Sequence, residues 1–326
     1  MRSAALALAV LSATGIAPAS PMASDPSAPH PRSTEDRARV HVAAGPTAGT
    51  GDPAYDKEIE TWRKAREDRL RSDDGWLTVA GLFWLAEGDN RFGSDPAAAV
   101  VLPAHSAPAQ AGVFRMHGKK VTVVPAPGVK ITTGGQPVTD RELRSDVAGP
   151  PDVLSLGALR FFVIERGGRM AIRLRDLQSP VRRNFAGVRW FPIRKEYRVV
   201  GRFIPHASPR RLSIPNVLGL VESMESPGVV EFRLQGQKLQ LEPVYETPER
   251  NELFFIFRDR TSGHETYGAG RFFYAEGPRN GEVVLDFNKA YTPPCGFTRF
   301  ATCPLPPRSN HLPVRIEAGE LNDSNH

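Results

Sequence analysis

Five polar residues near the carboxyl-terminal end have the types and spacing that could bind or transform a small molecule. Glu265, Tyr267 and Arg271 share one face if their segment is a strand, because alternate residues of a strand point the same way. Asp286 and Asn288 share a face of the strand expected next. Two carboxylates, an arginine and a tyrosine suffice for general acid/base catalysis or for holding a polar ligand. The same groups could also form cross-strand ion pairs with only a structural role.

The loop between these two strands decides whether the polar residues meet. A four-residue loop over residues 277–280 places Arg271 opposite Asp286, whereas a five-residue loop turns the two side chains to opposite faces. In the first register we expect one cleft that holds both carboxylates. Glu265 and Asp286 could then share the acid and base roles of a hydrolase.

The chain lacks the common motifs of other enzyme classes. It has no Gly-x-Ser-x-Gly elbow, no phosphate-binding Gly-rich loop, no dinucleotide fingerprint and no His-Glu-x-x-His helix. His264 precedes Glu265, but no second histidine follows four residues on. Ser262 and Thr266 have no neighbouring histidine or lysine to activate them. We therefore expect no cofactor and no metal.

Cys295 and Cys303 are the only two cysteines. Their spacing closes a short loop, and in an oxidising compartment we expect a structural disulfide worth roughly 2.5 kcal/mol by the loop-entropy estimate. A redox-active pair would sit two residues apart near a helix start. A zinc site needs four ligands, and only His311 lies near in sequence. Free thiols are the alternative.

The amino terminus has the three parts of a secretory signal. Residues 1–2 supply a positive charge, residues 4–16 are apolar and residues 17–19 are small. Pro18 interrupts the stretch before it reaches the roughly 20 apolar residues of a transmembrane helix. We expect cleavage after Ala19 and an exported protein, periplasmic or secreted, with no transmembrane segment.

The positive charge of the chain comes mostly from arginine. Net charge is +6, which either marks a surface for polyanions or follows a general compositional bias that also enriches Ala, Pro and Gly. No run of five basic residues and no helix-turn-helix or RNA-binding pattern accompanies the charge. We therefore expect no nucleic-acid partner.

Hydrophobic periodicity predicts a mainly β protein with one helix near its amino terminus. Residues 55–71 show helical spacing, and β-type runs alternate with Gly and Pro turns over 90–176 and again over 196–288. Thirty prolines in 326 residues argue against an all-helical bundle. The predicted organisation is a signal peptide (1–19), a disordered linker (20–53), a helix plus a sandwich-like β domain (54–177), a second, barrel-like antiparallel β domain with a disulfide-bonded carboxyl-terminal segment (178–320), and a tail (321–326).

Several long and specific strings lie between the first helix and Glu320. They are Gly75-Trp76-Leu77, Gly81-Leu82, Trp84-Leu85, Gly88-x-Asn90, Phe92-Gly93, Gly167-x-x-Met170-Ala171-Ile172-Arg173, Glu265-Thr266-Tyr267-x-Ala269-Gly270-Arg271, Asp286-Phe287-Asn288-Lys289-Ala290-Tyr291, Pro293-Pro294-Cys295, Ala301-Thr302-Cys303-Pro304-Leu305-Pro306-Pro307, Asn310 and Ala318-Gly319-Glu320. These strings resemble the family called domain of unknown function 1684, and they cover nearly everything from the first helix to Glu320. The family implies an exported bacterial or archaeal protein without an assigned activity, so the resemblance transfers no catalytic residue. The family pattern has an Asn before its two prolines where this chain has Thr292, which puts any polar role of that position in doubt.

A second likeness concerns the first β domain. Residues 91–95 followed by residues 100–103 are similar to the opening of forkhead-associated sandwiches, which bind phosphothreonine. The Ser and His of that module's recognition loop are missing, and Gly134-Gly135 stands where an Asn-Gly is expected. The likeness implies a sandwich shape without phosphopeptide binding.

We expect, from these patterns together, an exported protein that binds a small polar or anionic ligand, or an envelope component, on its last β-hairpin. The ligand-binding residues would be Glu265, Tyr267, Arg271, Asp286 and Asn288. One alternative is a hydrolase that uses Glu265 and Asp286 as its acid/base pair. Another is a structural or partner-binding envelope protein, in which the polar face would be flat.

Overall fold

The computed structural model describes residues 50–247, 249–250 and 252–322. The predicted signal peptide (1–19) and most of the predicted linker (20–53) lie outside the described residues, as does most of the tail (321–326). In the described part of the chain, no helix is long and apolar enough to span a bilayer.

The predicted amino-terminal helix is confirmed as α1 (Pro53–Arg71). Asp52 caps it by accepting a hydrogen bond from the backbone N–H of Tyr55 at 3.2 Å, and the proline at the first helical position suits a helix start. Tyr55, Ile59 and Leu70 form its buried side. The remaining helices are short: η1 (Trp76–Thr78), η2 (Asp146–Ala148), α2 (Pro180–Arg183), η3 (Lys195–Tyr197), η4 (Phe287–Lys289), η5 (Pro294–Gly296) and η6 (Arg308–Asn310).

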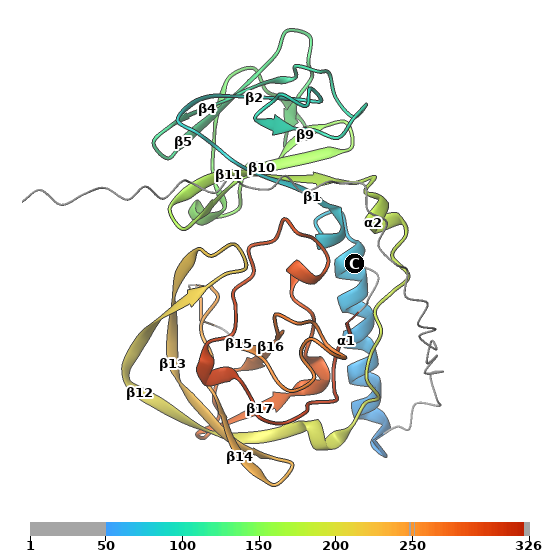
Figure 1. Ribbon diagram of the computed structural model, residues 1–326, viewed down its shortest axis with the longest axis vertical. Helices are drawn as coiled ribbons and strands as arrows, with labels where there is room; N and C mark the ends of the chain where they lie inside the picture. The colour runs from blue at the N-terminus through green and yellow to red at the C-terminus, as the bar shows by residue number, and fades with distance from the viewer. Residues whose placement is uncertain (1–49, 248, 251, 323–326) are drawn as a thin grey trace, which may run out of the picture. The chain divides into compact units, whose positions relative to one another are not determined.

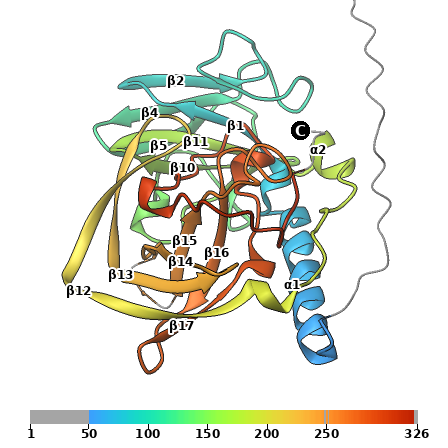
Figure 2. The same ribbon diagram turned by 60° about the horizontal axis from the view of Figure 1, so that its bottom comes forward.

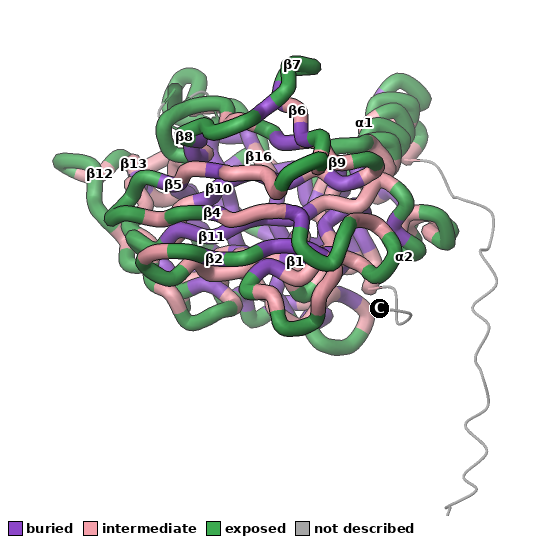
Figure 3. Tube along the Cα trace, turned by 90° about the horizontal axis from the view of Figure 1, so that it is seen from above, coloured by how far each residue is buried: buried purple, intermediate pink, exposed green. Residues whose placement is uncertain are grey.

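Two sheets follow α1 in the chain and share one core, to which each contributes aromatic side chains such as Phe92 and Phe161. Buried residues dominate β10 and β11, which are covered on both faces (Figure 3). One sheet contains, in order, β1 (Val79–Trp84), β11 (Arg169–Asp176), β10 (Leu159–Arg166), β9 (Leu154–Leu156), β6 (Thr132–Thr133) and β7 (Gln136–Pro137). The other contains β3 (Val100–Val101), β2 (Gly88–Gly93), β4 (Gly112–His117), β5 (Lys120–Pro125) and β8 (Arg141–Leu143).

The second half of the chain forms a curled four-stranded sheet and a two-stranded sheet. The long strands of the first curve around the second and the carboxyl-terminal segment (Figures 1 and 2). Phe255, Phe273 and Phe287 pack in their common core. The strands are β14 (Gln237–Leu241), β13 (Val221–Leu234), β12 (Arg198–Pro215) and β17 (Glu282–Asp286) in one sheet, and β15 (Glu252–Phe257) and β16 (Arg271–Glu276) in the other.

The hairpin of β12 and β13 extends far beyond its own core and is held at its tip. Leu220 packs against Gly167 in the turn between β10 and β11, where a positive φ of +56° favours glycine. The backbone N–H of Val217 donates to the carbonyl of Cys303 at 3.0 Å. The tip is therefore fixed against both β11 and the carboxyl-terminal segment. The mainly β, antiparallel fold class is confirmed, whereas the boundary at residues 177 and 178 stays a prediction.

Candidate functional site

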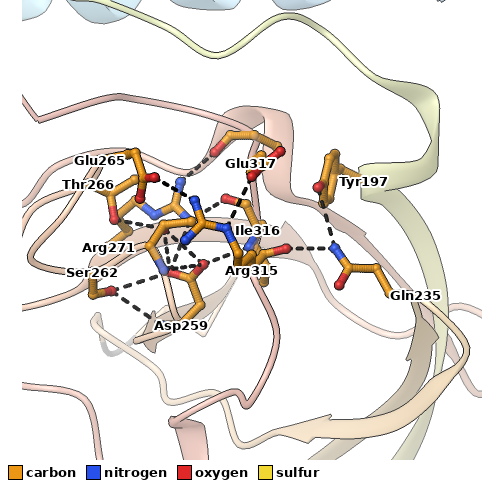
Figure 4. Close-up of polar contacts among 12 residues, drawn as sticks. Tyr197, Gln235, Asp259, Ser262, Glu265, Thr266, Arg271, Arg315, Ile316 and Glu317 are labelled. Carbon is orange, nitrogen blue, oxygen red and sulfur yellow. Dashed lines mark hydrogen bonds and ion pairs between the residues drawn. The ribbon is translucent and has the colours of Figure 1, made fainter.

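Arg271, the centre of the predicted binding face, is enclosed by protein. Its side chain is fully buried, and its Nη2 forms an ion pair with Asp259 Oδ1 at 3.2 Å (Figure 4). The same nitrogen donates to the carbonyl of Ile316 at 2.9 Å, and Nη1 donates to the carbonyl of Ala318. Desolvation lowers the pKa of this guanidinium. Arg271 thus fastens β16 to the carboxyl-terminal segment.

Glu265 and Tyr267 do not share a strand face with Arg271, so that prediction is wrong. Strand β16 begins at Arg271, and residues 261–266 form turns in which the carbonyl of Thr261 accepts successive backbone N–H groups. Arg315 Nη2 donates to Glu265 Oε1 at 2.5 Å in an exposed ion pair (Figure 4). Tyr267 Oη donates to the carbonyl of Cys295 at 3.1 Å.

Asp286 and Asn288 lie against the amino-terminal helix. Tyr55 Oη donates to Asp286 Oδ1 at 2.9 Å and accepts from Asn288 Nδ2 at 3.0 Å. Asn288 Nδ2 also donates to the carbonyl of Arg194 at 2.8 Å. Desolvation raises the pKa of Asp286. The cluster therefore joins α1 to the end of β17 and leaves its polar groups paired.

The ladder expected between β16 and β17 is also wrong, because each strand pairs with another partner. Arg271 lies opposite Phe257 of β15, and Asp286 lies opposite Arg198 of β12. Neither loop length considered for residues 277–280 brings Arg271 and Asp286 together, since the two residues belong to different sheets.

Removing the Tyr55 hydroxyl tests whether this cluster is structural. Tyr55→Phe should lower the free energy of unfolding by about 1–3 kcal/mol, because the buried Asp286 carboxylate loses a donor and the buried Asn288 amide loses an acceptor. Urea denaturation measures the loss. Tyr197→Phe is the control, since the Tyr197 hydroxyl receives only a 3.5 Å contact from Gln235, and it should cost about 0.5 kcal/mol or less. Equal losses in the two variants would contradict the role assigned to Tyr55.

Cys295 and Cys303 lie side by side in the carboxyl-terminal segment. The backbone N–H of Cys295 donates to Cys303 Sγ at 3.1 Å. Cys303 is buried and Cys295 partly buried. The contact brings the two residues close together, and the disulfide stays a prediction.

A cavity of about 490 Å³ lies where distant parts of the chain converge. Its lining includes Arg66 of α1, Arg173 of β11, Met224 of β13, Tyr274 of β16 and Cys303 of the carboxyl-terminal segment. This volume falls within the range of roughly 300–1,000 Å³ that is usual for small-molecule sites. We refer to it as the Arg173 cavity.

Arg173 stands out among the residues of this cavity. Its neighbours Ile172 and Leu174 point into the sandwich core, so Arg173 lies on the opposite face of β11. The side chain is only 5% exposed, yet its Nε and Nη2 have no hydrogen-bond partner among the described residues. Its guanidinium lies over the Trp76 ring at 5.1 Å. Desolvation lowers the pKa of Arg173 to about 10, which still leaves the group charged at neutral pH.

The other two arginines of the Arg173 cavity already have carboxylate partners. Arg66 Nε lies 3.4 Å from Glu320 Oε2, and its Nη2 donates to a backbone carbonyl at 2.8 Å. Arg166 Nη1 lies 2.8 Å from Asp146 Oδ2. Among the described residues, Arg173 is therefore the lining arginine without a carboxylate partner.

A second cavity of about 470 Å³ shares Tyr274 and Tyr291 with the first. Asp286 lines it, but Glu265 does not. The two carboxylates considered as a hydrolase pair therefore do not share this cavity. Within the described ranges, no group of three or more His, Cys, Asp or Glu side chains could hold a metal ion.

The sequence contained a usable sign of Arg173 that the predicted site left out. Residues 170–174 form a predicted strand in which a single arginine interrupts an apolar run. A charged residue inside such a run is expensive to bury without a partner. The sequence does not show that β13 and β16 lie around β11. Local patterns alone therefore could not indicate that Arg173 faces a cavity.

Comparisons with known proteins place the chain among uncharacterised relatives. A family model described as "Protein of unknown function (DUF1684)" matches residues 183–321. An uncharacterized protein of Haloarcula marismortui, solved by solution NMR, is 32% identical over 44% of this chain and 81% of its own, with a TM-score of 0.39. The FHA domain of FhaA is 21% identical over 28% of this chain and 86% of its own, with a TM-score of 0.21. No curated protein matches.

Proposed function

Residues 183–321 of this chain belong to the DUF1684 family of unknown function, and we propose that the protein binds a small molecule with an anionic group in the Arg173 cavity. The observation that carries the proposal is the buried guanidinium whose Nε and Nη2 have no partner in the described part of the chain. An isolated charge in a protein interior is costly. A ligand carboxylate or phosphate would offset that cost.

The chemistry of the guanidinium indicates how the anion would bind. Nε–H and one Nη2–H lie along one edge of the planar group, and this edge matches a carboxylate or phosphate with two parallel hydrogen bonds. These are the two nitrogens of Arg173 left without partners. The Trp76 ring, 5.1 Å from the guanidinium carbon, covers one face of the group and limits its rotation. Arg173 is therefore oriented before a ligand arrives.

The aromatic part of the cavity lining suits an apolar body on the ligand. Phe272, Tyr274 and Tyr291 line it together, and the Tyr274 and Tyr291 rings stack with centroids 6.4 Å apart. Aromatic walls with a few placed polar groups are typical of small-molecule sites. This concave lining favours ligand binding over the flat face expected of a purely structural envelope protein.

Export is a separate proposal. It rests on the sequence of residues 1–19, which lie outside the described residues. Charged, apolar and small-residue parts succeed one another over residues 1–19. An exported binding protein would meet its ligand in the periplasm or outside the cell. The ligand site proposed here lies on β11 rather than on the last hairpin.

Replacing Arg173 tests the proposal directly. Arg173→Met should abolish ligand retention, measured as the excess of the native mass over the denatured mass, because the variant keeps the bulk of the side chain and loses its charge. Arg175→Met is the matched control, since Arg175 shares the strand and face and also has an unpartnered Nε but does not line the cavity. It should retain the ligand.

Two outcomes would contradict the anion site. One is retention that survives in Arg173→Met. The other is wild-type protein that shows neither a retained mass nor a rise in melting temperature with millimolar 3-phenylpropionate. Ligand-free Arg173→Met should be about 1 kcal/mol more stable than wild type, because a buried unpaired charge has been removed. A clear loss of stability would instead favour a structural role for Arg173.

A further inference from the structure

We infer that the ligand of the Arg173 cavity is a zwitterion, with an ammonium group as well as a carboxylate on an apolar body. This inference rests on the proposed function and adds a second recognition point, Glu222. Glu222 belongs to β13, pairs with Ile214 of β12 and lines the same cavity as Arg173. Its Oε1 is buried and has no hydrogen-bond partner among the residues that the structure describes.

Two ionic groups of the cavity lack partners among the described residues, and they indicate which groups a fitting ligand would carry. Its lining contains three arginines and three glutamates. Arg66 and Arg166 have the carboxylate partners given above, Glu165 Oε1 lies 2.5 Å from Lys119 Nζ, and Glu246 accepts from the Tyr274 hydroxyl. Arg173 and Glu222 remain, one a donor without an acceptor and the other an acceptor without a donor.

A simple anion would satisfy only half of this arrangement. It would pair with Arg173 and leave the buried oxygen of Glu222 without a hydrogen bond, which costs binding free energy. A ligand with both charges would satisfy both groups. The aromatic side chains Trp76, Phe272 and Tyr291 would hold its apolar part. An apolar amino acid and a short apolar peptide share this chemistry.

The position of Glu222 explains how one site draws on both halves of the chain. Arg173 comes from β11 in the first half, whereas Glu222 lies two residues after the Leu220 contact at the tip of the long β12–β13 hairpin. That contact, made with Gly167 beside the cavity, fixes the end of the hairpin next to β11. The long β12–β13 hairpin therefore brings the Glu222 carboxylate to the cavity that Arg173 lines.

The test compares four probes that share a phenyl ring. Isothermal titration calorimetry of the dialysed full chain measures L-phenylalanine, the dipeptide L-phenylalanyl-L-alanine, 3-phenylpropionate and phenethylamine. At least one of the two zwitterions should bind tenfold or more tightly than 3-phenylpropionate or phenethylamine. Whichever zwitterion binds better identifies the source as a free amino acid or a peptide.

Substituting Glu222 separates this inference from the proposed function. Glu222→Gln should reduce the preference for the zwitterion to threefold or less while the affinity for 3-phenylpropionate stays the same or rises. Glu225→Gln, on the same strand but outside the cavity lining, should keep the tenfold preference. Its melting temperature and that of Glu222→Gln confirm that both variants fold.

Each alternative result overturns a different statement. Equal or tighter binding of 3-phenylpropionate by the wild type overturns the zwitterion and leaves the anion site standing. A preference for the zwitterion that persists in Glu222→Gln overturns the assignment to Glu222. No binding of any probe also overturns the zwitterion inference, and the native masses of the wild type and Arg173→Met then decide the anion site by themselves.

Discussion

Arg271→Ala lowers the free energy of unfolding by about 3–5 kcal/mol, the usual effect of breaking a buried ion pair. The substitution leaves Asp259 charged in a site without solvent, because both side chains are fully buried at a separation of 3.2 Å. It also removes the donors for the carbonyls of Ile316 and Ala318. Those carbonyls belong to the carboxyl-terminal segment, which should loosen from β16.

Urea denaturation followed by tryptophan fluorescence measures this loss, and Arg315→Ala supplies the control. Arg315 pairs with Glu265 at the surface, where both side chains are exposed, so its loss should cost less than about 1 kcal/mol. The double variant Asp259→Leu, Arg271→Met should recover the part of the stability that the unpaired charge costs, because it removes both charges, but not the part lost with the backbone hydrogen bonds to Ile316 and Ala318. A single variant Arg271→Ala within 1 kcal/mol of the wild type would show that the pair is not buried in solution.

This expectation reverses the one that the sequence alone supports. If Arg271 held a ligand in an open cleft, its removal would abolish binding and barely change the melting temperature. The alternation that includes Arg271 also includes Phe273 and Ala275, both buried. An arginine in step with buried apolar residues points into the core. The burial of Arg271 could be predicted in this way, but its ion pair with Asp259 could not.

Local sequence patterns predicted the amino-terminal helix and the β-rich remainder well, but they did not predict which strands pair with each other. The helix over residues 55–71 and the β-rich remainder follow from periodicity, and both are confirmed. The pairing expected between β16 and β17 is wrong because it assumed that strands adjacent in sequence pair with each other. Asp286 instead pairs with Arg198 of β12. Non-local pairing depends on how whole sheets pack, and no short string records it.

The strings that carry the family resemblance include several side chains that fasten the backbone. Asn90 donates to the carbonyls of Gly88 and Phe114. Asn288 holds Tyr55, as described above, and Arg271 holds the carboxyl-terminal segment. Asn288 and Arg271 were candidate binding residues in the sequence because their types are those of binding sites. In the structure they satisfy buried backbone groups, which requires the same types.

Asn310 gives the sharpest test of this fastening role. Its Oδ1 accepts from the backbone N–H of Glu242 at 2.8 Å, and its Nδ2 donates to the carbonyls of Glu242 and Ile256, both at 2.9 Å. Glu242 follows β14 and Ile256 lies in β15, so one carboxamide joins two sheets. The side chain is buried, and water cannot readily replace these bonds.

Asn310→Ala should therefore lower the free energy of unfolding by about 3 kcal/mol, since three buried backbone groups lose their partner. Urea denaturation measures the loss, with Asn184→Ala, a change at an exposed position, as a control expected to stay within about 0.5 kcal/mol of wild type. Ligand retention should persist in folded Asn310→Ala, because Asn310 does not line the Arg173 cavity. A loss below 1 kcal/mol would mean that β14 and β15 hold together without this bridge, and the fastening role would then fall to their shared apolar core.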